Sequence, residues 1–428
     1  MQKNHPITKV LAVIGILFIF LVILRVIRNN INSSGETPGT TINTGTTSLQ
    51  KEQIVDCVAG SSKCPELTIS GDSLAKLPNG ELSYFKGFAD PSIRSDPVSR
   101  KLWLAYSWPN IHAKSKTEVV PGVDIHLASS SDGGDTWTYE GALWDSKEDN
   151  NVVNGESGYT DNEVVNLLPV EDAGEVTWYA VRIQYFLPTD GGFKKRPVTS
   201  FRLKIGKASS PLGLSSAEMQ TLGAVKSDQR WGIDQNLSDL SSDAQKCQFW
   251  NEPSLYYEDG RLYLVVRCLA FTLFGLQPDA AKSDQMVFYT DPSGDAKNWK
   301  WTYVGILAGN NEAKEFGADG ITQVDIVKGE DGALLAVFSP DRYDSSTKDF
   351  IHYGCRVVEI NPMSDPGFKR DSDGNLIIRA AVNTSDLSEI GPGACSYDPE
   401  SSTGIIITRR EKTSTSLTAG LYVTGLHP

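Results

Sequence analysis

The stretch "FADPSIRSDPVSRKLWLAYS", residues 88–107, is the unit from which the fold can be inferred. An aspartate directly before a proline opens a short strand, a polar turn follows, and an aromatic and aliphatic run completes a hairpin. The pattern returns in residues 249–268 as "FWNEPSLYYEDGRLYLVVRC", where a glutamate replaces the aspartate. The chain therefore contains a structural repeat that carries an acid at its start.

Five copies of this unit follow one another from about residue 84. The other three begin with "YTDNEVV" at 159–165, "GADGITQ" at 317–323 and "GACSYDP" at 393–399. Further apolar runs such as "VDIHLASS" and "TWTYEG" add a third and a fourth strand. Four strands per unit and five units predict an all-β fold, a five-bladed β-propeller. A six-bladed, sialidase-like propeller is the alternative.

The fifth copy ends one strand short at the C-terminus. The segment "ELTIS", residues 66–70, is expected to supply the missing strand. Such a closure would remove an exposed sheet edge.

A turn motif in the first unit supports the propeller. The segment "SSDGGDTW", residues 130–137, matches the pattern S-x-D-x-G-x-T-W and resembles the Asp-box of sialidase-like and other propellers. The residues that carry the match have an expected structural role at the blade periphery, and they are Ser130, Asp132, Gly134, Thr136 and Trp137.

Charge and the N-terminal residues define the expected location. The 428-residue chain has a net charge of −13, which disfavours nucleic acid as a partner. Residues 10–24, "VLAVIGILFIFLVIL", are apolar, and Val26 and Ile27 extend the run beyond Arg25. With the Arg25 side chain reaching to the interface, the segment can cross a bilayer. We therefore expect a membrane anchor or signal segment in 1–28, a flexible linker in 29–64 and the propeller in 65–428. The propeller is expected to be extracytoplasmic, held by an N-terminal transmembrane helix; a cleaved signal peptide is the alternative.

Six cysteines fit an exported domain with disulfides. No C-x-x-C pair occurs and the histidines are scattered, so no zinc site is expected. The expected pairs are Cys57–Cys64, Cys247–Cys268 and Cys355–Cys395, and free buried cysteines are the alternative.

Three acids open the first strands of units one to three: Asp90, Asp161 and Glu252. First strands line the central channel of a propeller, so these acids are expected to converge. Clustered carboxylates repel one another, which keeps one of them protonated near neutral pH. A protonated acid beside an ionised one is what glycosidic bond cleavage requires. Alternatively, each acid only caps a turn.

The order Asp, Asp, Glu on blades one to three resembles the five-bladed enzymes of glycoside hydrolase family 43 and their invertase-like relatives. The resemblance implies that Asp90 is base or nucleophile, that Asp161 tunes the acid and that Glu252 is the general acid. One departure concerns register: family members usually place the glutamate two residues before the proline, whereas Glu252 directly precedes Pro253. A one-residue shift reverses the face of a strand.

Other side chains are candidates for substrate binding. Aromatic residues that could stack on sugar rings, although blade packing is the alternative, are Trp250, Tyr159 and Trp108. Arginines that could bind a carboxylate sugar are Arg182, Arg267 and Arg409.

The expected function is that of a glycoside hydrolase with a carbohydrate substrate. A sialidase-like exo-glycosidase and a non-catalytic propeller that binds glycans or proteins are the alternatives. No cofactor is expected, with a central calcium ion as an open option.

Overall fold

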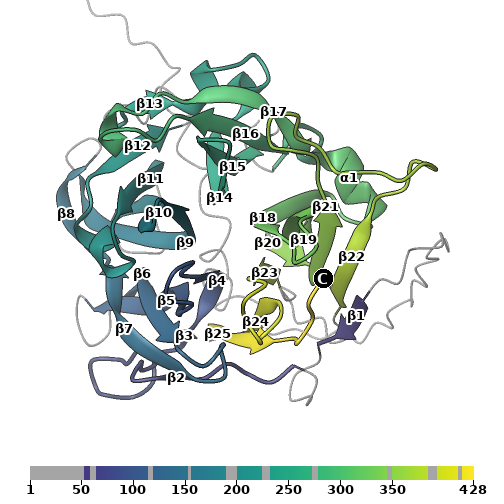
Figure 1. Cartoon of the computed structure of the whole chain (residues 1–428). Helices are drawn as coiled ribbons and strands as arrows, with labels where there is room; N and C mark the ends of the chain where they lie inside the picture. The colour runs from purple at the N-terminus through teal and green to yellow at the C-terminus, as the bar shows by residue number, and fades with distance from the viewer. Residues whose placement is uncertain are drawn as a thin grey trace, which may run out of the picture.

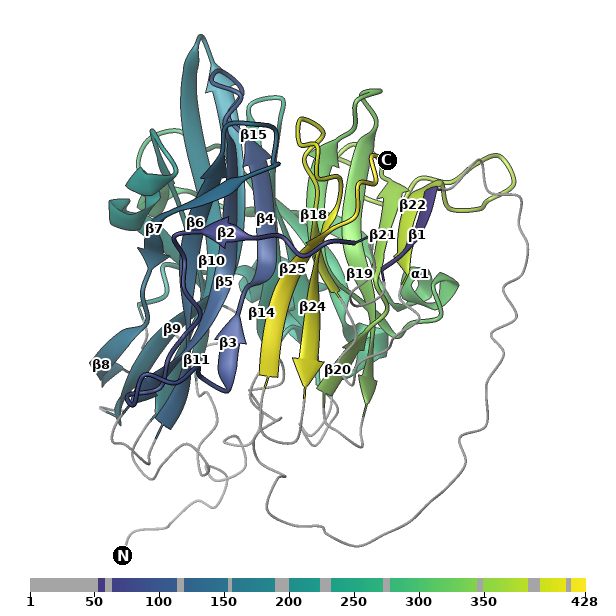
Figure 2. The ribbon, with the colours of Figure 1, turned by 90° about the horizontal axis from the view of Figure 1, so that it is seen from below.

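The computed structural model describes residues 53–57, 64–113, 119–152, 156–188, 200–223, 232–271, 278–344, 349–383, 393–412 and 417–428. In these residues, five β-sheets stand around one axis as the blades of a propeller (Figure 1). The predicted five-bladed fold is confirmed and the six-bladed alternative is wrong. Figure 2 shows the blades from the side, with the inner strands running nearly parallel to the axis.

In each blade the consecutive strands are antiparallel and follow one another from the axis outward, and a short added strand pairs in parallel on the outer edge of blades one, two, four and five. Blade one comprises β4 (Ala89–Ser95), β5 (Leu102–Ala113), β6 (Val119–Ser130), β7 (Trp137–Trp144) and the added β2 (Ile69–Ser70). Blade two comprises β9 (Glu156–Asp172), β10 (Glu175–Pro188), β11 (Ser200–Ala208), β12 (Met219–Gly223) and β13 (Gln235–Asn236), with β8 (Lys147–Val152) on the other edge of β9. Blade three comprises β14 (Phe249–Glu258), β15 (Arg261–Leu269), β16 (Asp284–Thr290) and β17 (Thr302–Ala308).

Blades four and five complete the ring. Blade four comprises β18 (Gly320–Lys328), β19 (Leu334–Asp344), β21 (Cys355–Glu359), β22 (Ile378–Asn383) and β1 (Gln53–Asp56), with β20 (Asp349–His352) paired to the end of β19. Blade five comprises β23 (Gly393–Ser396), β24 (Ile406–Lys412), β25 (Leu417–Val423) and β3 (Phe85–Gly87). The helices are α1 (Asn310–Glu315) and the short 3-10 turns η2 (Leu212–Ser216), η4 (Leu237–Asp239), η5 (Ala244–Lys246), η6 (Ala280–Lys282) and η7 (Ala296–Asn298).

Two N-terminal segments close the ring on the outer edge of β25. The strand β3 pairs in parallel with the start of β25, and Glu66 bridges antiparallel to Tyr422 near its end. The same segment then forms β2, which pairs with β7 of blade one. Blade five is therefore completed by β3 rather than by residues 66–70 as predicted; that segment meets β25 through the Glu66 bridge and the Leu67 amide, and its strand β2 belongs to blade one.

The N-terminal edge of the fold lies earlier than expected. Strand β1 pairs in parallel with β22, so Gln53 to Asp56 form the outermost strand of blade four. Residues 53–57 thus belong to the propeller rather than to the linker predicted for 29–64. The apolar stretch at 10–24 lies outside the described residues, and within the described part of the chain no helix has the length and apolarity needed to cross a bilayer.

All three predicted disulfides are present. They are Cys57–Cys64, Cys247–Cys268 and Cys355–Cys395. The last joins β21 of blade four to β23 of blade five, so it fixes two neighbouring blades.

The motif at residues 130–137 forms a tight turn between β6 and β7. The Asp132 carboxylate accepts hydrogen bonds from the Ser130 hydroxyl at 2.7 Å and the Thr136 amide at 3.0 Å. The amide of Gly134 donates to the Ser130 hydroxyl, and the buried Trp137 indole donates to the Gly134 carbonyl. These contacts stabilise the turn; its assignment as an Asp-box stays a prediction.

The inner strand of every blade carries a β-bulge at the same place. The bulge residue has a left-handed φ of 48° to 57° in all five blades: Asp90, Val164, Glu252, Gln323 and Ala394. The bulges therefore show which residues of the five blades occupy equivalent positions, even where their sequences differ.

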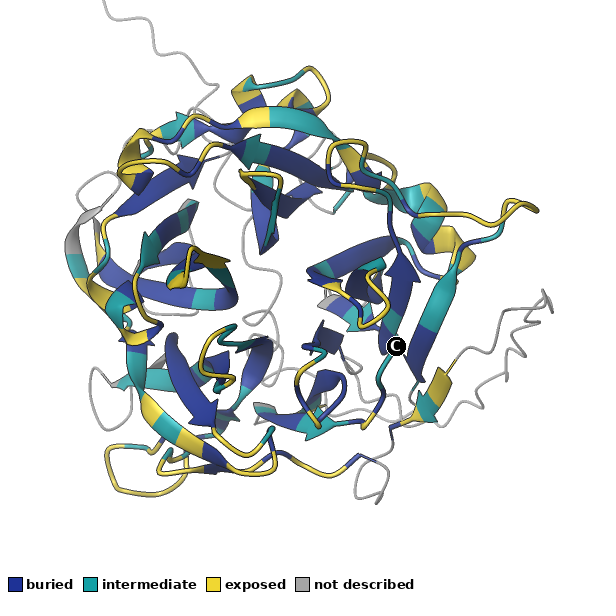
Figure 3. Ribbon diagram, viewed as in Figure 1, coloured by how far each residue is buried: buried dark blue, intermediate teal, exposed yellow. Residues whose placement is uncertain are grey.

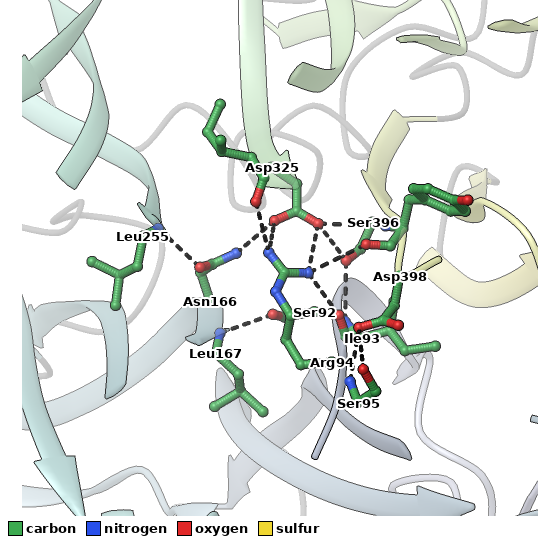
Figure 4. Close-up of polar contacts among 12 residues, drawn as sticks. Ser92, Ile93, Arg94, Ser95, Asn166, Leu167, Leu255, Asp325, Ser396 and Asp398 are labelled. Carbon is green, nitrogen blue, oxygen red and sulfur yellow. Dashed lines mark hydrogen bonds and ion pairs between the residues drawn. The ribbon is translucent and has the colours of Figure 1, made fainter. Parts of the chain in front are cut away.

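Two residues beyond the bulge, small polar side chains form a ring about the axis: Ser92, Asn166, Ser254, Asp325 and Ser396. The Ser92 hydroxyl accepts a hydrogen bond from the Leu167 amide of the next blade at 2.9 Å, and Asn166 accepts one from the Leu255 amide at 2.9 Å. The Ser396 hydroxyl accepts from the Ile93 amide at 3.1 Å, which joins blade five to blade one. The ring thus fixes the bulges of adjacent blades relative to one another (Figure 4).

A buried ion pair fills the middle of this ring. The Arg94 guanidinium of blade one binds both carboxylate oxygens of Asp325 in blade four, and both side chains are about 95% shielded from solvent. Asp325 also accepts hydrogen bonds from Asn166 and Ser396, so four blades meet at one carboxylate (Figure 4). The cation that balances the buried Asp325 carboxylate on the axis is therefore the Arg94 side chain.

Apolar side chains pack between the blades. Buried residues run through the strands of every blade, while exposed residues gather in the turns (Figure 3). Trp103 of blade one meets Trp178 of blade two with ring centroids 6.4 Å apart. Such contacts hold the inner strands and their bulges in place.

Candidate active site

Two of the three predicted acids occupy equivalent bulge positions. Asp90 and Glu252 have nearly equal φ angles, 49° and 51°, and each directly precedes a proline. The expected reversal of the strand face at Glu252 does not occur, because the bulge itself changes the direction of the side chain. The negative charge of Asp90 acts directly on Glu252, which places the two carboxyl groups in one site.

Asp90 is held by two donors from other blades. Its Oδ1 accepts hydrogen bonds from Gln323 Nε2 at 2.8 Å and from the Arg410 guanidinium at 3.0 Å. Its amide donates to the Thr408 hydroxyl at 3.0 Å. Asp90 is only 4% exposed, so an ion-paired carboxylate is fixed at the centre of the ring.

Glu252 is buried without a cation of its own. It is 3% exposed, and its Oε2 has no hydrogen-bond partner among the described residues. Burial and the charge of Asp90 raise the pKa of Glu252 to about 8, against weaker opposing effects of Arg267 and Arg410. At neutral pH its carboxyl group therefore carries a proton.

The third acid at the centre is Glu163, which the sequence reasoning missed. It directly precedes the blade-two bulge residue Val164, and its side chain is half-buried. Burial and the charges of Asp90 and Glu252 raise the pKa of Glu163 well above its usual range. The structure thus brings together Asp90, Glu163 and Glu252.

Asp161 lies beside this cluster rather than at the equivalent position. Its fully buried carboxylate pairs with the imidazole of His112 from blade one at 2.8 Å. The His112 ring stacks on Tyr159 with centroids 3.9 Å apart. Burial raises the pKa of Asp161, while the His112 hydrogen bond opposes the increase. The blade-two acid of the central cluster is therefore Glu163, and the placement of Asp161 there is corrected.

Several buried polar atoms at the bulges have no partner in the described part of the chain. They belong to residues of blades three, four and five, namely Asn251 Nδ2, Glu252 Oε2, Thr322 Oγ1, Gln323 Oε1, His352 Nδ1 and Arg410 Nη1. Buried polar groups are normally hydrogen-bonded, so such a concentration marks a place where a polar ligand can supply the missing contacts.

The three predicted arginines have different neighbours. Arg267 binds Asp341 of blade four through two hydrogen bonds of 2.7 and 3.0 Å. Arg409 lies over the Tyr422 ring at 5.2 Å, and Arg182 lies over the Trp144 ring at 4.1 Å. Arg410, the residue after Arg409, binds Asp90 of the carboxylate cluster directly, and Arg267 acts electrostatically on Glu252. Consecutive residues of a strand point to opposite faces, so Arg409 faces away from the side that Arg410 occupies.

Two predicted aromatic residues have packing partners. Trp250 is 3% exposed and meets Phe288 edge-on at 5.6 Å. Trp108 stacks on His126 at 4.5 Å and its indole donates to the Ser73 carbonyl. Their role in substrate binding stays a prediction.

A metal site was an open option at the centre. No group of three or more His, Cys, Asp or Glu side chains suited to a metal ion occurs among the residues that the structure describes. The carboxylates that meet at the bulges are instead faced by Arg410 and Gln323.

The chain was compared with known proteins. No protein-family model matches it, and no curated protein matches it either. Similar solved structures include a thermostable family-43 glycoside hydrolase, with 13% identity, a TM-score of 0.41 and coverage of 79% of this chain and 88% of the other. Another is an endo-arabinase from Bacteroides thetaiotaomicron, with 15% identity, a TM-score of 0.39 and coverage of 78% and 93%.

A third similar structure is sucrose-6-phosphate hydrolase from Lactobacillus gasseri, with 12% identity, a TM-score of 0.42 and coverage of 79% of this chain and 58% of the other. Identities and TM-scores this low carry no conclusion about chemistry, so function must be derived from the site.

Proposed function

We propose that this protein is an exported glycoside hydrolase in which Glu252 is the general acid and Asp90 the base or nucleophile. One observation carries the proposal: a buried carboxyl group whose pKa is raised to about 8 lies in the field of an ion-paired carboxylate at the centre of the ring. Glycosidic bond cleavage uses such a pair.

The two acids have complementary tasks in this mechanism. Glu252 keeps its proton at neutral pH and donates it to the leaving oxygen of the glycosidic bond. Asp90, fixed by Arg410 and Gln323, either attacks the anomeric carbon or removes a proton from the attacking water. Because Arg410 and Gln323 fix its position, Asp90 needs little reorganisation during the reaction.

Glu163 takes the tuning role that the resemblance implied for Asp161. The charges of Asp90 and Glu252 act on Glu163, so the three carboxyl groups share one site. The three carboxyl groups titrate as one coupled cluster, in which ionisation of one group disfavours ionisation of the others. The unpartnered atoms of Asn251, Gln323 and His352 are available to bind sugar hydroxyl groups.

Two substitutions test these roles on chromogenic arabinosides, xylosides, galactosides and fructosides. We expect Asp90→Asn to abolish hydrolysis of every substrate that the wild type cleaves. Glu252→Gln should lose activity on glycosides with poor leaving groups but retain most of it on dinitrophenyl glycosides, which need no protonation.

Glu163→Gln and Asp161→Asn are the matched variants. If Glu163→Gln, rather than Glu252→Gln, shows the dependence on the leaving group, Glu163 is the acid and our assignment is wrong. If wild type and Asp90→Asn are equally inactive on the whole panel, the hydrolase proposal fails in favour of a glycan-binding propeller.

We also propose that residues 1–28 anchor the propeller in a membrane. The support is the apolar run at 10–24 and its flanking cations. Full-length protein should sediment with membranes and resist extraction by carbonate, whereas a chain that begins at residue 29 should remain in the supernatant. Recovery of both forms in the supernatant would contradict the anchor.

A further inference from the structure

Blade two carries a group of three cations that the carboxylate site does not use. Arg182 on β10 stands directly opposite Lys204 on β11, and the next pair on the same face joins Gln184 to Arg202. Opposite residues of antiparallel strands point to the same side of the sheet. We call Arg182, Arg202 and Lys204 the basic cluster. It lies in a chain whose net charge is −13.

Arg182 is almost completely buried at the innermost position of the cluster. It is 5% exposed, and its Nε donates to Asn162 Oδ1 at 2.9 Å. Its guanidinium lies 4.1 Å from the centre of the Trp144 ring of blade one. Its Nη1 donates to the Met219 sulfur at 2.6 Å, and among the described residues no carboxylate pairs with Arg182. Burial and the charge of Arg202 lower its pKa to about 9.

Lys204 is half-buried beside it and also lacks a carboxylate partner in the described ranges. Its ammonium donates to the Thr221 hydroxyl at 2.6 Å. Burial and the charges of Arg202 and Arg182 lower the pKa of Lys204 to about 7, with Asp234 opposing and Lys297 reinforcing the effect. Lys297 is itself paired with Glu218 at 3.6 Å.

Arg202 connects the cluster to the surface. Its Nε donates to Gln184 Oε1 at 2.7 Å, and its side chain is half-buried. A Cβ atom built on the exposed Gly232 would lie 3.8 Å from Arg202 Nη1, so the cluster reaches the rim of the blade. Asp149 and Asp234 act electrostatically on Arg202, and Asp234 also acts on Lys204, but among the described residues no carboxylate pairs directly with Arg182 or Lys204.

We propose that the basic cluster is a binding site for a compact oxyanion, such as the carboxylate of an acidic sugar or a sulfate group. A planar guanidinium and an ammonium that stand opposite each other offer several charge-assisted donors to one anion. Burying two cations side by side is unfavourable unless an anion compensates them. A bound oxyanion would supply the compensating negative charge. The Trp144 ring, which lies against the Arg182 guanidinium, forms an apolar side of the site.

The site is separate from the carboxylate cluster but adjacent to it. Asn162 of β9 accepts hydrogen bonds from both Arg182 and Gln184, and the next residue is Glu163. Consecutive residues of a strand point to opposite faces, so β9 lies between the two sites. Binding at the basic cluster does not depend on hydrolysis.

Calorimetric titration of the full-length protein in detergent, at constant ionic strength, tests the proposal. The probes are sodium glucuronate and sodium sulfate, with glucose as the neutral control. Binding of either anion supports the site and distinguishes a sugar acid from an inorganic anion. We expect Lys204→Met to weaken that binding about tenfold or more and Lys204→Arg to preserve most of it.

Lys207→Met is the matched control, because Lys207 lies on the same strand and binds the Pro292 carbonyl at 2.6 Å instead. It should leave anion binding unchanged. The pH profile gives a second readout: wild-type affinity should fall as pH rises from 6 to 8, since Lys204 loses its proton with a pKa of about 7 in the free protein, while Arg182, with a pKa of about 9, keeps its own. Lys204→Met should remove this dependence.

Four results would overturn the proposal. They are the absence of binding by both anions, equal affinity of wild type and Lys204→Met, equal weakening by Lys207→Met, and glucose binding with the same dependence on Lys204. Thermal unfolding of each variant without ligand shows whether it is folded.

Discussion

Replacing Glu252 by glutamine should stabilise the fold while it removes function. Folding raises the pKa of this carboxyl group from 4.5 to about 8. Protonation of Glu252 is therefore more favourable in the native state than in the unfolded chain by about 5 kcal/mol. In the unfolded chain the group ionises freely above pH 4.5, whereas the native state keeps its proton up to about pH 8. The native state therefore binds more protons between these values, and stability falls as pH rises through this window.

Because of this one group, the free energy of unfolding of the wild type is roughly 3 kcal/mol lower at pH 7 than near pH 4. Glutamine keeps the shape and the neutral charge of the protonated acid, and it does not ionise. Glu252→Gln should therefore unfold at a higher denaturant concentration than wild type at pH 8, and the difference should vanish near pH 4.

The assay is urea unfolding followed by tryptophan fluorescence at pH 4, 6 and 8, with activity measured on the same samples. Glu258→Gln is the control, because Glu258 is at the other end of β14 and is partly exposed. If Glu252→Gln is no more stable than wild type at pH 8, or gains equally at every pH, Glu252 is not a strained neutral acid and its assigned role is refuted.

Three further substitutions test the scaffold. Arg94→Met should lower the free energy of unfolding by about 3–5 kcal/mol because it leaves the buried Asp325 carboxylate uncompensated, and addition of Asp325→Asn should recover part of the loss in urea titrations. Replacing Cys247 and Cys268 by serine removes a cross-link over 21 residues and should cost about 3 kcal/mol, measured against wild type with its disulfides intact. Gly87→Ala should open the ring and increase proteolysis of the N-terminal segment, because a Cβ there would lie 1.9 Å from a β25 carbonyl oxygen.

Much of the ring could be predicted from local pattern. Each blade begins with a hairpin whose two strands are close in sequence, so alternation and turn residues are enough to find it. Asp90 and Glu252 were found because both precede a proline at the start of such a hairpin. The disulfide Cys247–Cys268 was found for the same reason, since its cysteines flank one hairpin.

Features that depend on long-range register could not be predicted. Strands β1 and β3 are too short to show a period, and they pair with strands more than 300 residues away. The basic cluster requires Arg182 on β10 to face Lys204 on β11, and the number of residues between the two strands does not determine their register. Glu163 was missed because "YTDNEVV" was aligned on its aspartate. The small polar residue two places after each bulge, Asn166 in this blade, gives the correct alignment.

The strained backbone of the two acids belongs to the architecture rather than to catalysis. A left-handed φ costs a non-glycine residue roughly 1 kcal/mol or more. Val164 adopts this conformation although its side chain is apolar, β-branched and without a chemical role. Gln323 and Ala394 share the conformation, so the five bulges are a requirement of closing the ring. Each bulge gives its residue the same backbone conformation at the same place in the inner strand. Acids at two of these positions, and at the residue before a third, are therefore sufficient to build a convergent carboxylate site on a repeated scaffold.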